Sequence, residues 1–496
     1  EAARLKAVGL TGIRTVGAWT VAGKPRPEGM DDWTHAWHGP DNNLVSLDTL
    51  VKPSSQLQWT AGPFFGHHRG PIGGVSAGGR IFYVLYDNPL GVTMPARVFL
   101  AARDAYNGKL LWRHPLPNTT LLTWGQAPFF RPATLVAAED MVFAVLEPGA
   151  PLSALEATTG RLLRKYDGLP SPEVVVHYRK TLILGSAAGL HAADTESGKL
   201  LWKKKVRLAR TTQSWQKMNC LWKGGPLAVA EDRVFFLEGE QLVCLDVKTG
   251  NQVWKTDAGA KLARGKGNLV MGPFYRGLVV LRGRGGVHAF SAADGRHLWS
   301  QSGSRGYGIG GLVWVWFLDK NTGKRGWIGL DLKNGEERRR VEMVSKLPAH
   351  IQGKRILDGQ CNHPLATEKY FISTTRMSLI DTTSGEFHNT MITRAPCKFL
   401  LALPANGLLY SFPKDCKCYP CLRGMLAYAP PPAALRRGND GRRLERGPVF
   451  GNVPAGPAPA HDDWPTHRAD GRRSSSTQPG IPAGLKRLWS TEVGGK

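Results

Sequence analysis

Long apolar runs are missing from this sequence of 496 residues. No stretch approaches the ~18 to 20 apolar residues that a membrane-spanning helix needs, so no transmembrane segment is predicted. The first 30 residues also lack the charged and then apolar order of a targeting signal. The sequence therefore predicts no membrane span and leaves the compartment open.

Several short catalytic motifs are absent as well. The sequence contains no C-x-x-C-H haem attachment site, no H-E-x-x-H metal motif, no Walker phosphate loop and no G-x-S-x-G nucleophile turn. No catalytic residue is predicted from motifs of these kinds.

Acidic residues are scarce relative to basic ones. The chain has 39 Asp and Glu against 65 Lys and Arg, a formal net charge of +26. Such a charge favours nucleic acid, anionic lipid or acidic polysaccharide as a partner. The basic residues are scattered, however, so most are interpreted as solvated faces and linker. Nucleic acid is the least favoured partner, and an anionic polysaccharide is retained beside a protein.

What the sequence does have is an internal repeat. Seven copies share an acidic or small residue, a glycine four positions later and a further position, four beyond, that is Trp in four copies. The copies begin at Asp104, Glu156, Asp194, Asp246, Ser291, Asp331 and Asp381. Their glycines lie 38 to 52 residues apart, which matches the length of a four-stranded propeller blade. The repeat predicts an all-β fold, a β-propeller of four-stranded antiparallel blades.

Turn chemistry explains the repeat. Each copy places Asn-Gly, Thr-Gly, Ser-Gly or Asp-Gly between two strand-like runs, and the glycine supplies the positive φ of a tight hairpin or its bulge. The acidic residue accepts hydrogen bonds from free N–H groups of the turn. The tryptophans are expected to wedge one blade against the next. These structural staples are Trp59, Trp112, Trp202, Trp254 and Trp299.

The segments VCLDVKTGNQVW and LHAADTESGKLLW resemble the tryptophan-docking repeat of pyrroloquinoline-quinone (PQQ) dehydrogenases and of the BamB assembly lipoprotein. The segments DDWTHAWHGPDNN, VSAGGRIFYVLYDNP, CNHPLATEKYFI and PANGLLYSFPKDCKCY resemble a narrower group, the large multidomain PQQ-like repeat proteins of planctomycete-type bacteria. The resemblance covers roughly residues 31–430. It implies the fold and a bacterial periplasm, envelope or cytoplasm as compartment, but it is a weak guide to function.

The number of blades follows from the ends of the repeat region. Two strand-like runs, 407–412 and 424–430, remain after the seventh copy, and a lone outer strand at 57–62 precedes the first. An open ring exposes unpaired edges, so pairing the early strand with the late ones completes another blade. We therefore expect eight blades closed by an N-terminal strand, with seven as the alternative.

The rest of the chain divides into three segments. Residues 1–30 are expected to form an N-terminal arm, a short helix and then a strand, or the end of a preceding α/β domain that resembles a methyltransferase. Residues 431–460 have the Pro- and Arg-rich composition of a linker. Residues 461–496 repeat the word DDW and the spacing to a second Trp seen at 31–59, so they are expected to begin a second propeller that the sequence cuts short.

Cysteine is infrequent, with seven residues in all. Cys220 and Cys244 lie in apolar surroundings and are expected to be buried thiols. Four later cysteines have the ligand count for a tetrahedral zinc site, namely Cys397, Cys416, Cys418 and Cys421. Their spacing lacks two short pairs, so disulfides or free thiols are the favoured interpretation and zinc is the alternative.

Histidines offer a further candidate site. His35 and His38 precede His67 and His68 by some 30 residues. Four imidazoles on loops can bind a metal or act as bases. Neighbouring residues of a strand point to opposite sides, so a turn-capping or surface role is favoured for these residues.

The sequence contains no recognisable set of residues that would bind PQQ. As a family, the PQQ dehydrogenases hold the cofactor with a vicinal disulfide, a Trp floor, a calcium bound by Glu and Asn, and a catalytic Asp. No two cysteines are adjacent in this sequence, and no segment carries the other groups as a set. The favoured function is therefore a non-catalytic scaffold that binds a protein, envelope component or polysaccharide on a ring face. The alternative is a PQQ- or metal-dependent oxidoreductase with its site in the central channel.

Overall fold

The computed structural model describes residues 2–53, 56–62, 74–87, 97–117, 132–208, 225–262, 269–283, 285–319, 321–322, 324–342, 365–373, 377–388, 393, 402–413, 422–430 and 451. Internal contacts divide the chain into two units, residues 1–432 and 433–496. All elements given below belong to the first unit.

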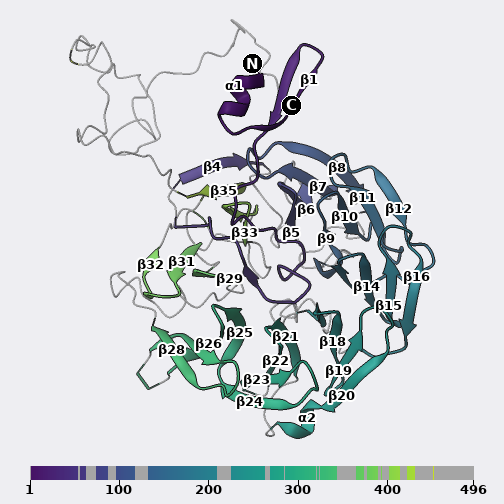
Figure 1. Cartoon of the computed structure of the whole chain (residues 1–496), viewed down its shortest axis with the longest axis vertical. Coiled ribbons are helices and arrows are strands. Elements are labelled where there is room, and N and C mark those ends of the chain that lie inside the picture. Colours follow the sequence, from purple (N-terminus) through teal and green to yellow (C-terminus); the bar gives the residue numbers. More distant parts are fainter. Residues whose placement is uncertain are drawn as a thin grey trace, which may run out of the picture. The chain divides into compact units, whose positions relative to one another are not determined.

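Eight antiparallel sheets stand around a central axis in chain order (Figure 1). Blade 1 contains β5 (Gly74–Ala77), β6 (Arg80–Asp87), β7 (Arg97–Asp104) and β8 (Leu110–Leu116), and blade 2 contains β9 (Val136–Ala137), β10 (Met141–Ala144), β11 (Ser153–Glu156) and β12 (Leu162–Lys165). Blade 3 contains β13 (Val174–Tyr178), β14 (Thr181–Ser186), β15 (Gly189–Asp194) and β16 (Leu200–Lys204), and blade 4 contains β17 (Leu227–Ala230), β18 (Arg233–Glu238), β19 (Gln241–Asp246) and β20 (Gln252–Asp257).

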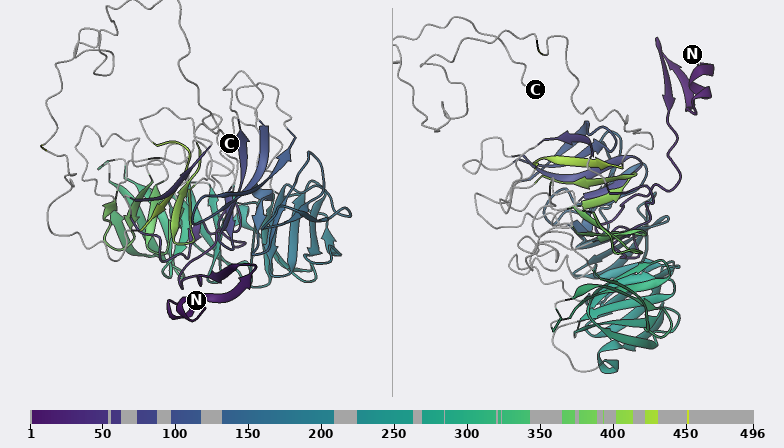
Figure 2. Two further views of the ribbon diagram at one scale, coloured as in Figure 1. Left: turned by 90° about the horizontal axis from the view of Figure 1, so that it is seen from above. Right: turned by 90° about the vertical axis from the view of Figure 1, so that its left-hand side faces the viewer.

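The second half of the ring repeats this plan. Blade 5 contains β21 (Val270–Tyr275), β22 (Leu278–Gly283), β23 (Gly286–Ser291) and β24 (His297–Ser302), and blade 6 contains β25 (Ser304–Ile309), β26 (Leu312–Leu318), β27 (Arg325–Asp331) and β28 (Glu337–Glu342). Blade 7 contains β3 (Val45–Ser46), β29 (Leu365–Thr367), β30 (Tyr370–Ser373), β31 (Ser378–Asp381) and β32 (Phe387–His388), and blade 8 contains β33 (Ala402–Ala405), β34 (Leu408–Ser411), β35 (Met425–Ala429) and β4 (Gln56–Ala61). The side views of Figure 2 show the strands running between the two faces of the ring.

The ring is closed by the early strand, as predicted. β4 pairs antiparallel with β35, and Trp59 lies opposite Ala427. The eighth blade is thus built from both ends of the propeller, which removes the free edge of an open ring. Both the count of eight blades and the closing strand are confirmed.

Blade 7 differs from the expected four-stranded plan. The short strand β3 pairs parallel with β29, through Val45 opposite Ala366 and Ser46 opposite Thr367. Because β3 comes from the N-terminal part of the chain, it lies on the inner side of this blade and makes it five-stranded.

The N-terminal region contains a short helix, α1 (Ala2–Ala7), and a two-stranded hairpin of β1 (Thr11–Val16) and β2 (Trp19–Gly23). The prediction of one continuous strand after the helix is wrong here. Gly17, with φ of 61°, allows the chain to reverse between Val16 and Trp19, which pair across the turn. The other helical pieces are the 3-10 turn η2 (Pro132–Thr134) and α2 (Ala258–Lys261).

The repeated turns behave as their sequence predicts. The glycines of all seven copies have φ between 70° and 73°. In the copy at Asp246, the carboxylate oxygen Oδ1 accepts hydrogen bonds from the backbone N–H groups of Lys248 and Thr249. The acid and the glycine thus fix the turn between the third and fourth strands of a blade.

Each described tryptophan of the repeat lies against the next blade. The indole N–H of Trp202 donates to the carbonyl oxygen of Val247 at 2.7 Å, and its ring covers Gly250 so closely that an added Cβ would lie 2.5 Å from it. The same arrangement recurs at Trp59, Trp112, Trp254 and Trp299. Blade 2 has no tryptophan at this position, and there the Tyr166 hydroxyl donates to the carbonyl of Thr195 in blade 3.

A β-bulge recurs in the outer strand of each blade from 1 to 6. In blade 1, Ala102 lies opposite Trp112 and Arg103 lies opposite Leu110, so Leu111 is an extra residue without a partner. Register shifts at the equivalent place appear in blades 2 to 6. The bulge turns the tryptophan toward the next blade and leaves the extra residue at the rim.

Candidate functional site: the channel segment

Residues 31–48, here called the channel segment, run through the interior of the ring (Figure 1). At least one backbone N–H from each of the eight blades donates a hydrogen bond to this segment. The pairs, in chain order, are Asn406 to Asp31, Ser76 to Trp33, Ala137 to Thr34, His177 to His35, Val229 to Pro40, Phe274 to Asp41, Gly308 to Asn43 and Ala366 to Leu44. The segment therefore makes one lap of the ring and visits every blade.

The donors share one place in their blades. Seven lie in the last two residues of their first strand, and Asn406 follows the end of β33 directly. All eight therefore lie where the first strand turns into the second. We call this side of the ring the turn face, since the turn between the third and fourth strands of each blade lies there too. The channel segment fills the channel at the turn face.

The lap closes at blade 8, where it began. The backbone N–H of Asp31 donates to Oδ2 of Asp48 at 3.3 Å, and the N–H of Gly407 donates to the same oxygen at 2.7 Å. In return, Oδ2 of Asp31 accepts the N–H of Leu47 at 2.7 Å. Two carboxylates thus tie the first and last residues of the segment to one another and to the same blade.

At blades 4 to 6, two asparagine side chains of the channel segment hydrogen-bond to backbone groups of the blades. Asn43 accepts the N–H of Gly308 through Oδ1 at 3.0 Å and donates Nδ2–H to the carbonyl of the same residue at 3.1 Å. Asn42 accepts the N–H of Gly225 at 2.8 Å and donates to the carbonyl of Gly272 at 2.9 Å. An amide side chain has one acceptor and two donors, so it satisfies buried backbone groups of both kinds.

His35 is held neutral by its surroundings. Burial lowers its pKa to about 3, and the nearby rings of His177 and His38 contribute to the decrease. Its Nε2 accepts the N–H of His177 at 3.0 Å, so the ring proton resides on Nδ1 and is donated to Oγ1 of Thr34 at 2.7 Å. The Thr34 hydroxyl in turn donates to the carbonyl of His38 at 3.2 Å. This chain of hydrogen bonds uses both ring nitrogens and leaves neither as a free base.

His38 has the opposite character. Burial alone would lower its pKa, but the hydrogen bond to Asp31, with the charges of Asp31, Asp41 and Asp32, raises the pKa above its ordinary value. Its Nε2 lies 2.6 Å from Oδ2 of Asp31, and its ring meets the edge of Trp33 with centroids 5.1 Å apart. Burial likewise opposes the shift of Asp31, whose pKa is nevertheless lowered by the hydrogen bond and charge of His38. The two groups form a hydrogen-bonded pair inside the lap, and it is an ion pair whenever His38 is protonated.

A third acid, Asp41, is buried without such a partner. Burial raises its pKa, against the opposing effects of the His38 charge and of the hydrogen bond from the backbone N–H of Asn43. Asp41 is therefore more easily protonated than an ordinary aspartate. Its backbone carbonyl still accepts the N–H of Phe274 at 2.8 Å.

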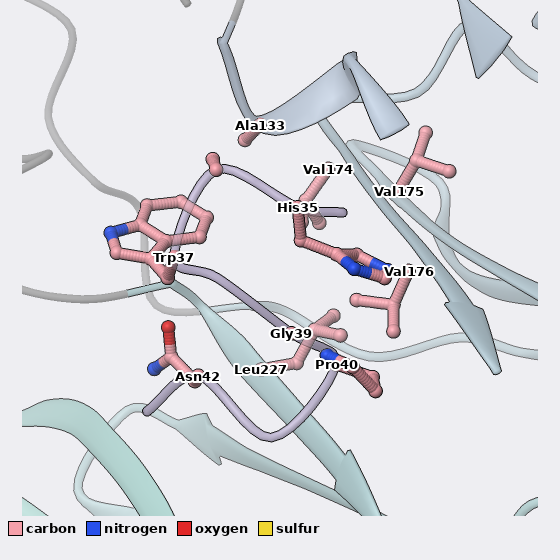
Figure 3. Close-up of a pocket in the computed structure, with 11 residues that line it drawn as sticks. His35, Trp37, Gly39, Pro40, Asn42, Ala133, Val174, Val175, Val176 and Leu227 are labelled. Atoms are coloured by element: carbon pink, nitrogen blue, oxygen red, sulfur yellow. The ribbon is translucent and has the colours of Figure 1, made fainter. Parts of the chain in front are cut away.

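A small recess adjoins the segment (Figure 3). It is lined by Trp37, Pro40 and Asn42 of the channel segment and by Val174 and Leu227 of blades 3 and 4. It offers about 10 Å³ to the centre of a water-sized sphere, which is close to the minimum that one water requires. The recess has no room for a cofactor.

The histidine and cysteine predictions fare differently. Of the two roles predicted for His35 and His38, the surface role is wrong, because both lie in the channel interior and are 5% and 9% exposed. The turn-capping role agrees with the hydrogen bonds among Thr34, His35 and His38. His67 and His68 lie outside the described residues, as does Cys220. Cys244 is a buried free thiol, as predicted, and burial raises its pKa to about 12. The zinc candidates Cys397, Cys416, Cys418 and Cys421 also lie outside the described residues, so a metal or disulfide there stays a prediction.

In the part of the chain that the structure describes, no three His, Cys, Asp or Glu residues are grouped so that they could hold a metal ion. None of the described helices combines the length and apolarity that crossing a bilayer requires.

Sequence reasoning did not identify the channel segment as a structural centre. The segment has neither strand alternation nor helical periodicity, so local pattern reading gives no element for it. A usable signal was present, nevertheless. Asp, Asn and His are dense over residues 31–43, and the word DDW returns at 462–464. Polar residues that recur with a propeller indicate a buried hydrogen-bonding role rather than a loop.

Comparison with known proteins agrees with this architecture. The chain matches the family described as outer membrane protein assembly factor BamB over residues 27–221 and 211–345. A search of curated proteins gives no match.

Among solved structures, BamB from Moraxella catarrhalis is 14% identical, with a TM-score of 0.41, over 74% of this chain and 98% of that one. Quinohemoprotein alcohol dehydrogenase from Comamonas testosteroni is 12% identical, with a TM-score of 0.47, over 80% of each chain. The computationally designed Ika8 protein is 12% identical, with a TM-score of 0.48, over 74% of this chain and 98% of that one.

Proposed function

Since this chain belongs to the PQQ-like propeller family described as outer membrane protein assembly factor BamB, we propose that it is a non-catalytic interaction propeller that binds a protein or envelope partner on its outer surface. The family description is that of an assembly factor, a class of protein that acts by contact with other molecules. A multidomain setting for the chain is part of the same proposal.

One observation favours this proposal over the alternative of an enzyme with its active site in the channel. The channel segment accepts an N–H from every blade, so the polar backbone groups at the turn-face end of the channel are satisfied by the chain itself. Buried polar groups that are already paired offer a ligand little further binding energy. The channel at this face contributes to closing the ring, and binding is left to the surfaces outside it.

The quinone site of the PQQ dehydrogenases does not fit the residues that the structure describes in this channel. The carboxylate of Asp31 accepts hydrogen bonds from His38, Leu47 and Asp32, and that of Asp48 accepts from Gly407 and Leu50. Neither is available as a calcium ligand without breaking the lap. The two asparagine amides are engaged in the same way.

The termini support the multidomain setting. Asp31 and Trp33 each make a defined contact inside the ring, and the same DDW word recurs at 462–464. We therefore propose residues 461–496 as the beginning of a second propeller and 431–460 as the linker before it. Limited proteolysis is expected to cut first within 431–460 and to leave 31–430 intact, whereas early cuts within 132–208 would contradict this division.

A quinone titration tests the function directly. PQQ is added to the purified full chain with calcium, and quenching of tryptophan fluorescence and reduction of an electron-acceptor dye with alcohols are followed. The proposal predicts no saturable quenching and no alcohol-dependent reduction. The Asn43→Ala variant lacks the two hydrogen bonds between the channel segment and Gly308 of blade 6. It is titrated in parallel as the matched control. Saturable binding of one equivalent of PQQ by the unaltered chain, with dye reduction, would establish the oxidoreductase instead.

A further inference from the structure

The outer strands of blades 1 to 3 present a pair of exposed leucines each. These six residues, here called the leucine rim, are 36% to 46% exposed: Leu110 and Leu111, Leu162 and Leu163, and Leu200 and Leu201. The strands β8, β12 and β16 are the outermost of their sheets and follow one another around the ring (Figure 1).

The repeated bulge places these leucines at the surface. Leu111, Leu163 and Leu201 are the extra residues of their bulges, between positions that pair normally with the third strand. A bulged residue has no opposite neighbour on which to pack. The bulge thus leaves these three leucines without a cross-strand neighbour, and part of the apolar surface of all six remains open to another surface.

Basic residues flank each leucine pair, and the strands themselves contain no acid. β8, β12 and β16 read LLWRHPL, LLRK and LLWKK. The exposed flanking residues are Lys109, Arg113, Arg161, Arg164, Lys165, Lys199, Lys203 and Lys205. On three neighbouring stretches of the rim, basic residues thus lie before and after a pair of adjacent leucines.

The next three blades differ at the same two positions. Blade 4 has Gln252 and Val253, blade 5 has His297 and Leu298, and blade 6 has Glu337 and Arg338. The bulge is present in all of them, so the fold alone does not require leucine pairs. The combination of two leucines with basic neighbours is confined to one side of the ring.

We propose that the leucine rim docks this protein onto an anionic lipid surface, with the leucines entering the interface and the Lys and Arg residues contacting the headgroups. Apolar insertion together with basic attraction is the chemistry by which peripheral proteins bind such surfaces. The rim is a docking surface and not a membrane span. The proposal goes beyond the scaffold function and does not depend on whether the channel binds a quinone.

Two other occupants fit the observations less well. A partner strand that adds to the outer edge meets a bulge and lysines, both of which oppose edge pairing. An acidic polysaccharide would use the basic residues and leave the leucines without a role. A lipid surface uses both groups, and it tolerates the separate positions of the three leucine pairs because it has no fixed shape.

The ring geometry adds a specific expectation. A flat surface that touches a ring from the side lies closest to the middle of three adjacent blades. Blade 2, with Leu162 and Leu163, should therefore contribute most, together with one of its neighbours at a time.

Vesicle co-sedimentation of the full chain tests the proposal. The lipids are phosphatidylcholine with and without about 30% phosphatidylglycerol, and the variant is Leu162→Ser/Leu163→Ser. We expect binding only to the anionic vesicles, about tenfold weaker in this variant because two large apolar side chains no longer enter the interface. The matched control is Val253→Ser, an equally exposed bulge residue of blade 4, which should change binding less than about twofold.

A second variant checks the electrostatic part. Arg164→Glu/Lys165→Glu should abolish the preference for anionic vesicles. Unchanged circular dichroism and urea midpoints will show that all variants are folded, which is expected since the altered residues are exposed. Absence of binding to anionic vesicles overturns the proposal. So does salt-sensitive binding that the leucine variant leaves unchanged, because the net charge alone would then account for it.

Discussion

The backbone N–H of Asp31 donates to the carboxylate of Asp48, 17 residues further along the chain, at a distance of 3.3 Å. Between these residues the chain touches all eight blades. A propeller is commonly closed at its rim, by pairing the first and last strands. This protein has that closure, through the pairing of β4 with β35. The channel segment is a second, independent closure at the centre of the ring.

The side-chain amide of Asn43 makes two hydrogen bonds to Gly308 that hold the channel segment to blade 6. Asn43→Ala leaves the N–H and C=O of Gly308 buried without partners, so we expect a loss of about 2 to 4 kcal/mol in the free energy of unfolding, measured by urea titration. Asn251→Ala, in an exposed turn of blade 4, is the control and should change little. Equal urea midpoints for the two variants would show that the amide of Asn43 is not needed.

Trp202 and Gly250 are predicted to be energetically coupled. Trp202→Ala should lower the free energy of unfolding by about 3 to 5 kcal/mol, the range for truncating a large buried aromatic side chain. Gly250→Ala should also be strongly destabilising alone, since its Cβ would lie 2.5 Å from the Trp202 ring. With Trp202→Ala already present, the same glycine change loses the clash and retains only its backbone strain, about 1 to 2 kcal/mol. Strict additivity of the two changes would refute the staple contact.

Acid should weaken the protein through His35. Its folded pKa of about 3 lies below the 6.5 of an unfolded histidine, so the unfolded chain binds more protons between these values. The stabilisation is therefore complete above pH 6.5 and is lost as the pH falls toward 3, by up to about 1.4 kcal/mol per pH unit. His38 has a raised pKa, so its contribution has the opposite sign: it is complete below its unfolded pKa and is lost as the pH rises through its folded pKa.

The measurement is a set of urea midpoints between about pH 4.5 and 6.5 for the unaltered chain and for His35→Gln. The unaltered chain should lose stability more steeply on acidification than the variant. Identical slopes would mean that His35 is not buried in its neutral form.

The four late cysteines are predicted to form at least one disulfide-capable pair, most favourably Cys397 with Cys416 or Cys418. Thiol counting before and after reduction, with metal analysis, decides the matter. The prediction is a rise of two thiols per chain on reduction and no stoichiometric zinc. One equivalent of zinc with all four thiols protected would establish the metal site, and four freely reactive thiols would exclude both.

The sequence was sufficient to predict the ring of blades, but not the role of the channel segment at its centre. The turn from Asp246 to Gly250 is determined by its own residues, so its repetition predicts blades without any long-range information. The strand around Trp59 was assigned correctly because an unpaired edge needs a partner. The role of Asn43 depends on Gly308, 265 residues away, and no local pattern encodes that contact. A surface role was one of two alternatives for His35, since a polar residue is usually exposed, and only its partners in the fold explain its burial.

Hydrogen exchange of the full chain, followed by mass spectrometry, tests the central claim that residues 31–48 fill the channel at the turn face. Peptides from this segment are expected to exchange as slowly as the inner strand β17, while the exposed strand β2 exchanges rapidly. Exchange of residues 31–48 at the rate of β2 would show that the segment is not held inside the ring.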